Sequence, residues 1–415
     1  MMAPDRPVHL LRPHMIHGRI GQFLENFPGD VAYAVRANFE NQIISEVYSG
    51  GLDWFACDTL DEIETVARVI PDAKFFFAHP IKSEKAIEEA YRKHRVRAFV
   101  LDHPDELAKI RAHTGPDATL LVRLVGPPGA LLGEGYRYGC DIERGAWLAR
   151  AVVDAGYKLG LCYSLGSQVM DPVMYDEAFL LMREVMYRAR FMIDMICVGG
   201  GFPGFYDGMY PPMLNDYCSV IKRGLSRLHL PRTCRVLATP GRYLVNDAVS
   251  VLVRVEQRRG QMLYVNDGLM VSLGSINVPW WRPTVRLVRT NGRPARELDR
   301  YLLSGPAGYG NDTIPGPYYL PEDARPGDYL ELGQLGAYSG CMTTAFQCIP
   351  WPDMVTVSDD PMTPAREDEM PQDMDEPITD EADEEPPYER GGGDEEGEYD
   401  EGDDYDDPGQ LPRRR

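Results

Sequence analysis

The sequence predicts an α/β protein: a (β/α)8 barrel over residues 20–245, a mostly antiparallel β domain over 246–355, and a disordered acidic C-terminal tail over 356–415. Strand-like and helix-like segments alternate as far as residue 240, which is typical of a parallel sheet with crossover helices. β-Branched runs separated by Gly and Pro then replace this alternation. With 44% hydrophobic residues among 415, the chain can bury two cores. Residues 1–19 form an N-terminal segment that can join the β domain.

Eight short apolar runs in the first part predict the barrel strands. They cover residues 31–36, 54–57, 74–78, 98–101, 119–124, 159–163, 195–198 and 235–238. Apolar residues at helical spacing predict helices at 59–69, 83–94, 104–112, 144–155 and 176–189, several with Asp, Ser or Thr as a cap. In such barrels the functional residues lie at the C-terminal strand ends, so we expect the site there.

The β domain is predicted from runs of β-branched and apolar residues at 250–255, 262–265, 284–287 and 329–332, and it closes near Trp351. The tail that follows carries 24 Asp and Glu against five Arg, a net charge of -19, whereas residues 1–355 carry only -2. Such a segment cannot bury enough apolar surface to fold alone. It is expected to be solvated, with a basic partner or a masked basic surface as the alternative. Its charge disfavours binding to nucleic acid.

The eight cysteines are scattered and form no Cys-x-x-Cys pair, which predicts reduced thiols in a cytoplasmic protein. The eight histidines form no ligand cluster, so no metal site is expected. No apolar run reaches the roughly 18 residues of a membrane span, and the first 13 residues lack a signal-peptide pattern. The sequence therefore predicts neither membrane insertion nor export.

Five motifs occur in order along the chain: Tyr-Ala-Val-Arg-Ala-Asn at 33–38, Gly-Gly-Gly-Phe-Pro-Gly at 199–204, Pro-Gly-Arg-Tyr at 240–243, Tyr-Val-Asn-Asp-Gly at 264–268 and Gly-Ala-Tyr at 336–338. Together they resemble the ornithine decarboxylase family, the fold-type III pyridoxal-phosphate-dependent ornithine, lysine, arginine and diaminopimelate decarboxylases. The resemblance implies an alanine-racemase-like barrel and a link to polyamine chemistry. It also implies a head-to-tail homodimer, or a heterodimer with an active relative, since the family includes non-catalytic antizyme inhibitors.

The resemblance implies that the family's cup for the cofactor phosphate is kept. The matching positions are Ser167, Gly199, Gly200, Gly201, Arg242 and Tyr338. Glycines let backbone N–H groups approach an anion, and arginine is a two-pronged charged donor. A phosphorylated group is therefore expected to bind at these residues.

Four positions that handle the cofactor ring differ from the family. Arg36 replaces the lysine that forms the Schiff base, and a guanidinium cannot lose its proton to act as an amine. Thr239 replaces the acid that keeps the pyridine nitrogen protonated. Ser164 replaces the stacking histidine, and Ala56 replaces an aspartate near the lysine. Covalent catalysis and most of the electron sink are expected to be lost.

The substrate positions are altered as well. Residues 305–309 read Gly-Pro-Ala-Gly-Tyr, so Gly308 replaces the family's proton-donating cysteine and Tyr309 its acid for the distal amine. A second aspartate is missing near residues 278 and 279, where the chain reads Val-Pro and continues with Trp280 and Trp281. A missing proton donor costs about 10²- to 10⁴-fold in rate, which by itself a slow enzyme survives.

These changes favour a non-catalytic homologue that acts by binding a phosphorylated or anionic ligand, or by associating with a partner subunit. No covalent cofactor is expected, but pyridoxal phosphate or another phosphorylated ligand can bind non-covalently. Arg36 either reflects drift after the loss of catalysis or joins Arg242 in an anion site. The alternative is a pyridoxal-phosphate-dependent decarboxylase with atypical chemistry, in which Lys82 supplies the amine. The sequence leaves open whether the protein is an enzyme, and the altered positions favour a non-catalytic protein.

Overall fold

The computed structural model describes residues 4–362, apart from 134–136, 278–280, 309 and 311. Eight parallel strands form a closed barrel, as predicted, because the last strand pairs with the first. These strands are β2 (Asp30–Ala34), β3 (Trp54–Cys57), β4 (Lys74–Phe77), β5 (Ala98–Leu101), β6 (Thr119–Val125), β7 (Lys158–Ser164), β8 (Met195–Cys197) and β9 (Arg235–Ala238).

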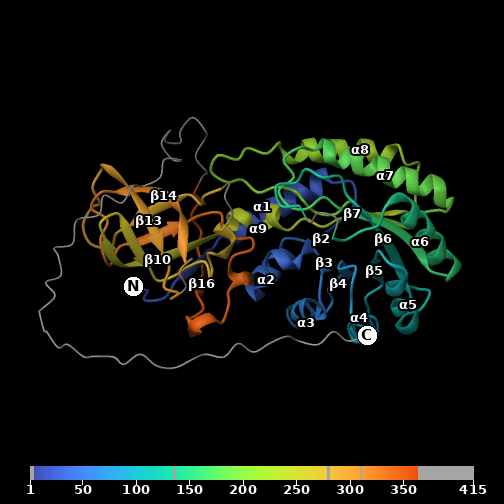
Figure 1. Ribbon diagram of the computed structural model, residues 1–415, viewed down its shortest axis with the longest axis horizontal. Helices are drawn as coiled ribbons and strands as arrows, with labels where there is room; N and C mark the ends of the chain where they lie inside the picture. Colours follow the sequence, from blue (N-terminus) through green and yellow to red (C-terminus); the bar gives the residue numbers. More distant parts are fainter. Residues whose placement is uncertain (1–3, 134–136, 278–280, 309, 311, 363–415) are drawn as a thin grey trace, which may run out of the picture. The chain divides into compact units, whose positions relative to one another are not determined.

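Helices lie between the strands and surround them (Figure 1). They are α1 (Pro13–Asn26), α2 (Asn41–Ser49), α3 (Leu60–Val69), α4 (Glu84–Arg92), α5 (Pro104–His113), α6 (Ile142–Asp154), α7 (Val173–Ala189), α8 (Leu214–Ser226) and the short α9 (Arg242–Val245). The expected caps are present: Thr59, Ser83 and Asp141 each accept a hydrogen bond from a backbone N–H in the first turn of α3, α4 and α6.

The first barrel strand is shorter than predicted, and this changes the local setting of Arg36. β2 ends at Ala34, and Val35–Ala37 form the 3₁₀ turn η1, in which Asn38 N donates to Val35 O. The prediction of a strand through residue 36 was therefore wrong by two residues. Val35 and Ala37 of this turn are buried in the apolar core, whereas Arg36 lines a pocket at the C-terminal end of the barrel.

The second part of the chain is a mostly antiparallel sheet, as predicted. Its strands are β10 (Val249–Arg259), β11 (Met262–Val265), β12 (Val285–Val288), β13 (Leu298–Ser304), β14 (Thr313–Pro321) and β15 (Tyr329–Leu332), in the order β12-β15-β10-β11-β13-β14. The strand β1 (Val8–Leu11) pairs with β10, and β16 (Asp353–Thr356) pairs with β1 in turn. The N-terminal segment thus enters this sheet, while β13 and β14 were not predicted from the sequence.

The β domain extends into the segment that was expected to be tail. β16 ends at Thr356, and Asp359 forms an ion pair with Arg12 at 3.0 Å. Arg12 is fully buried and also pairs with the buried Glu331 at 3.1 Å. The remainder of the predicted acidic tail, residues 363–415, lies outside the described residues.

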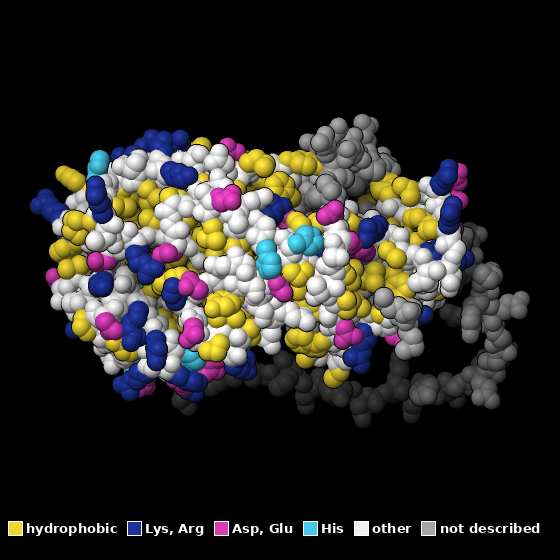
Figure 2. Space-filling model, turned by 180° about the vertical axis from the view of Figure 1, so that it is seen from behind, with side chains coloured by type: hydrophobic (Ala, Val, Ile, Leu, Met, Phe, Trp, Pro, Cys, Tyr) yellow, Lys and Arg dark blue, Asp and Glu magenta, His cyan; other side chains and the backbone are white. Residues whose placement is uncertain are grey.

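Three apolar clusters stabilise these elements: one between the barrel strands and the helices, one inside the barrel and one within the β domain. On the face drawn in Figure 2, basic and acidic side chains are interspersed, in keeping with the nearly neutral charge of residues 1–355. All eight cysteines are free. Among the described residues, no helix combines the length and the apolar character needed to cross a bilayer.

Candidate ligand site at the barrel mouth

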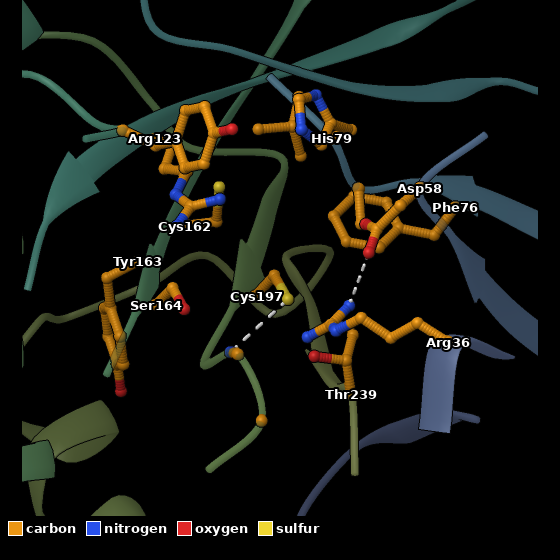
Figure 3. A pocket seen from close by; sticks show the side chains of 15 residues that line it. Arg36, Asp58, Phe76, His79, Arg123, Cys162, Tyr163, Ser164, Cys197 and Thr239 are labelled. Atoms are coloured by element: carbon orange, nitrogen blue, oxygen red, sulfur yellow. Dashed lines mark hydrogen bonds and ion pairs between the residues drawn. The ribbon is translucent and has the colours of Figure 1, made fainter. Parts of the chain in front are cut away.

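Arg36 points into a pocket at the C-terminal end of the barrel (Figure 3). Its Nη1 donates to Asp58 Oδ2 at 3.0 Å, and Asp58 directly follows β3. The two side chains are 37% and 22% exposed. A guanidinium stays protonated at physiological pH. Position 36 therefore offers a fixed cation and no amine that could condense with an aldehyde.

The pocket around Arg36, here called the deep pocket, has a volume of about 80 Å³ and lies between the ends of the barrel strands. Arg123 on β6, Cys162 on β7 and Cys197 on β8 line it, and Thr239 closes it after β9. Within the part of the chain that the structure describes, no three His, Cys, Asp or Glu side chains form a metal-binding group.

The sequence predictions missed Asp58 and Arg123 as members of this site. Arg123 had a signal, because it is the one charged residue in the otherwise apolar strand Thr119–Val125. A charge within a barrel strand faces either the covering helices or the barrel interior, and here it lines the interior pocket. Asp58 had the weaker signal of following a strand at its C-terminal end.

A second pocket, here called the outer pocket, lies beside the deep pocket and is lined by three of the six predicted cup residues. Its volume is about 480 Å³, and Ser167, Arg242 and Tyr338 line it. Arg242 Nε donates to Ser167 Oγ at 3.2 Å, and the guanidinium lies 4.8 Å from the Tyr338 ring centroid. Arg242 also donates to the Tyr206 hydroxyl, a contact the sequence did not predict. Arg36 lines this pocket too, so it belongs to both.

The glycines at 199–201 are needed for close packing. A Cβ on Gly199 would lie 2.6 Å from the Tyr163 carbonyl oxygen, and one on Gly200 would lie 2.6 Å from the Thr239 carbonyl oxygen. Gly199 also has a φ of +69°, which favours glycine. Gly199 and Gly200 line the deep pocket. Close packing alone therefore explains the glycines of this loop, and the argument for an anion site depends on Arg242.

The predicted ring-handling positions fall in two places. Thr239 and Ser164 line the deep pocket, and the Thr239 backbone N–H donates to the Gly199 carbonyl at 2.8 Å. Ala56 instead packs in the apolar cluster inside the barrel. The pocket thus presents a neutral hydroxyl at Thr239, which cannot hold a positive charge on a pyridine nitrogen.

The predicted substrate positions are only partly described. Gly308 donates its backbone N–H to Gln347 Oε1 at 2.8 Å, so this position holds a loop contact and no acidic side chain. Trp281 stacks on Tyr206 with ring centroids 4.0 Å apart and lines the outer pocket. Tyr309 and residues 278–280, including Trp280, lie outside the described residues.

No lysine lines either pocket, although all seven lysines of the chain lie among the described residues. Lys82, the alternative source of an amine, is buried and pairs with Glu106 at 2.9 Å. Its Nζ also donates to the Val100 carbonyl at 2.6 Å. Burial lowers the pKa of Lys82 to about 8, against the opposing effect of Glu106. Lys82 is therefore held inside a polar network and not presented to a ligand.

Glu62 lies behind the Arg36–Asp58 pair, and its raised pKa should make the free energy of unfolding depend on pH. Burial and then the charge of Asp58 raise the pKa of Glu62 from 4.5 to about 7. A raised folded-state pKa means that the folded chain binds the proton more tightly, so this contribution is complete below pH 4.5 and is lost as the pH rises to about 7. In the wild type, the free energy of unfolding should therefore fall by up to about 3 kcal/mol over this pH range. Glu62→Gln keeps an acceptor for the Asp58 N–H and should abolish this fall.

Urea unfolding of the wild type and Glu62→Gln at pH 5 to 8 measures this effect. The stability difference between the two should grow in favour of Glu62→Gln as the pH rises. Glu25→Gln on the exposed face of α1 is the matched control and should show no such trend. A difference that is constant with pH would contradict the assignment.

The first 250 residues decide the family. Residues 14–246 match the model of the pyridoxal-dependent decarboxylase pyridoxal-binding domain, which is more than half of the chain. The chain belongs to this family. Its relatives include decarboxylase flvG of Aspergillus flavus, 28% identical over 337 residues and 76% of each chain. The lysine/ornithine decarboxylase of Selenomonas ruminantium is 27% identical over 347 residues, covering 81% of this chain and 85% of the relative.

Solved structures agree with this assignment. The lysine/ornithine decarboxylase of Vibrio vulnificus complexed with putrescine superposes with a TM-score of 0.74 at 27% identity, over 85% of this chain and 94% of that one. The Paramecium bursaria Chlorella virus arginine decarboxylase bound to agmatine gives a TM-score of 0.76 at 21% identity, covering 86% and 98%. At that identity the second likeness shows the shared fold alone.

Pyridoxal phosphate, the cofactor of this family, fits the site at one end only. Arg242, Ser167 and Tyr338 converge in the outer pocket and suit a phosphate group. The aldehyde end has no lysine, and Arg36 is ion-paired there with Asp58. Thr239 offers the ring nitrogen no carboxylate. The residues present can therefore hold the phosphate, but they do not fit the covalent chemistry of the cofactor.

Proposed function

We propose that this protein is a non-catalytic member of the decarboxylase family that binds a phosphorylated ligand reversibly at Arg242. The observation that carries the proposal is that no lysine lines either pocket, while position 36 carries a guanidinium paired with Asp58. Without a lysine in either pocket, the site cannot attach an aldehyde cofactor covalently. Without an acid at position 239 it cannot stabilise a carbanion through a protonated pyridine ring.

The residues that remain are suited to binding. Arg242 is 7% exposed, and its hydrogen bond to Ser167, its contact with Tyr206 and its position over the Tyr338 ring hold the guanidinium in one place. A charge-assisted hydrogen bond from a fixed, largely buried donor is stronger than one from a mobile surface side chain. The outer pocket therefore favours a phosphate ester.

Calorimetric titration tests this function with pyridoxal 5′-phosphate and with pyridoxine 5′-phosphate, which lacks the aldehyde. We expect the two to bind with affinities within about threefold, because no covalent bond adds to the affinity of the aldehyde. Arg242→Gln should weaken both by about 10- to 100-fold, and Ser167→Ala should weaken both by less. The matched control is Arg92→Gln on the exposed face of α4.

An active decarboxylase is the competing function. Release of carbon dioxide from ornithine, lysine or arginine, together with a borohydride-reducible pyridoxal phosphate adduct on a wild-type lysine, would overturn the proposal. Failure of both phosphate esters to bind would also overturn it.

Association with a second subunit, implied by the family resemblance, stays a prediction. Light scattering after size exclusion should give twice the mass of one chain if the protein forms a homodimer. A single-chain mass that doubles only when an active decarboxylase is co-expressed would support the heterodimer.

A further inference from the structure

We propose that the ligand held by Arg242 carries a second anionic group, a carboxylate or another phosphate, which Arg36 and Arg123 bind in the deep pocket. This inference rests on the proposed function, since it assigns the other end of the same ligand. It starts from Arg36, which lines the outer pocket with Arg242 and the deep pocket with Arg123. A single molecule can therefore contact all three arginines.

Two guanidinium groups meet in the deep pocket. Figure 3 shows Arg36 entering from η1 and Arg123 from β6 on the opposite side, with Cys197 between them. Burial raises the pKa of the Cys197 thiol to about 12, and the charges of Arg123 and Arg36 both oppose that rise. The charges of both arginines thus reach the Cys197 side chain on β8, and they would stabilise an anion bound beside it.

The charge of the described lining favours an anion. Arg36 and Arg123 contribute two positive charges to the deep pocket, and Asp58 contributes one negative charge. Arg242 adds a third positive charge in the outer pocket, where its contacts with Ser167, Tyr206 and the Tyr338 ring are with neutral groups. A partly enclosed cavity with excess positive charge concentrates anions and repels the ammonium group of a diamine or diamino acid.

The nature of position 36 narrows the ligand further. A guanidinium forms no covalent bond with an aldehyde, but its planar array of N–H groups matches a carboxylate or phosphate. Asp58 holds Arg36 Nη1 at 3.0 Å and so fixes the group at the junction of the two pockets. The chemistry that suits the joined site is a phosphate ester carrying a second acid group.

A matched pair of probes tests this inference by calorimetry. Pyridoxine 5′-phosphate and 4-pyridoxic acid 5′-phosphate differ in bearing an alcohol or a carboxylate at one carbon. We expect the carboxylate to bind the wild type at least about 10-fold more tightly. Arg123→Gln should lower the affinity for the acid by about 10-fold or more and that for the alcohol by less than about threefold.

Arg36→Gln should reduce the preference for the acid in the same way, and Arg123→Lys, which keeps the charge, should retain part of it. Circular dichroism and thermal melting establish that each variant is folded. Equal binding of the two probes by the wild type would overturn the second anion site while leaving the phosphate cup intact. Loss of both probes only in Arg242→Gln, with the preference intact in Arg36→Gln and Arg123→Gln, would overturn it as well. Failure of both probes to bind the wild type would instead overturn the proposed function.

Discussion

Arg36→Lys is expected to convert a protein that forms no covalent adduct with pyridoxal phosphate into one that forms about one per chain after borohydride reduction. The substitution places an amine where the wild type has a guanidinium, next to the cup at Arg242. Lysine can lose its proton in a partly buried site and condense with the aldehyde, releasing water, whereas arginine cannot. Peptide mass mapping should locate the reduced adduct at position 36.

The same variant should still release no carbon dioxide from ornithine, lysine or arginine. Thr239 cannot hold the pyridine nitrogen protonated, and Gly308 cannot donate a proton, so the restored amine lacks the groups that complete the reaction. Arg36→Gln removes the same charge without adding an amine and is the control for the adduct. An adduct on a lysine of the wild type, or none at residue 36 of a folded Arg36→Lys variant that binds the cofactor, would refute the assignment of position 36.

Arg12→Leu is expected to lower the free energy of unfolding by about 3 kcal/mol. Arg12 is fully buried and pairs with Glu331, which is itself only 2% exposed, and it donates to Ser250 Oγ at 2.9 Å. Removing Arg12 leaves the buried carboxylate of Glu331 without its buried cationic partner. The cost of keeping that carboxylate away from water is the main part of the expected loss. Because Arg12 also pairs with Asp359, the substitution should loosen the link between the N-terminal segment and the end of the β domain.

Arg286→Leu is the matched control, because Arg286 pairs with the same Glu331 at 2.6 Å but its side chain is 51% exposed. Water compensates for an exposed cation, so the expected loss is below about 1 kcal/mol. Urea unfolding of both variants measures the contrast. Equal losses would show that the contribution of the Arg12–Glu331 ion pair to the free energy of unfolding does not depend on the burial of Arg12.

Local patterns predicted the barrel well because its strands are compact apolar runs, and several of the helices between them begin at a capping side chain. The strands 54–57, 98–101 and 235–238 were predicted with the observed bounds. β13 and β14 were missed because β13 begins with the charged residues Asp299 and Arg300 after a single Leu, and β14 contains Pro-Gly-Pro. β1 and β16 are four residues each, and they are strands only because β1 pairs with β10 and β16 pairs with β1.

The sequence by itself determined the fold class, which follows from the pattern of segments, and the chemistry of position 36, which follows from residue type. The cup residues were implied by the family resemblance, and their role stays a prediction. Only the tertiary structure decided that Asp58 pairs with Arg36, that Arg123 faces it across the barrel, and that Arg36 joins two pockets. These residues come from separate strand ends, more than 20 positions apart in the sequence. Their meeting depends on closure of the barrel, a non-local event that no local pattern encodes.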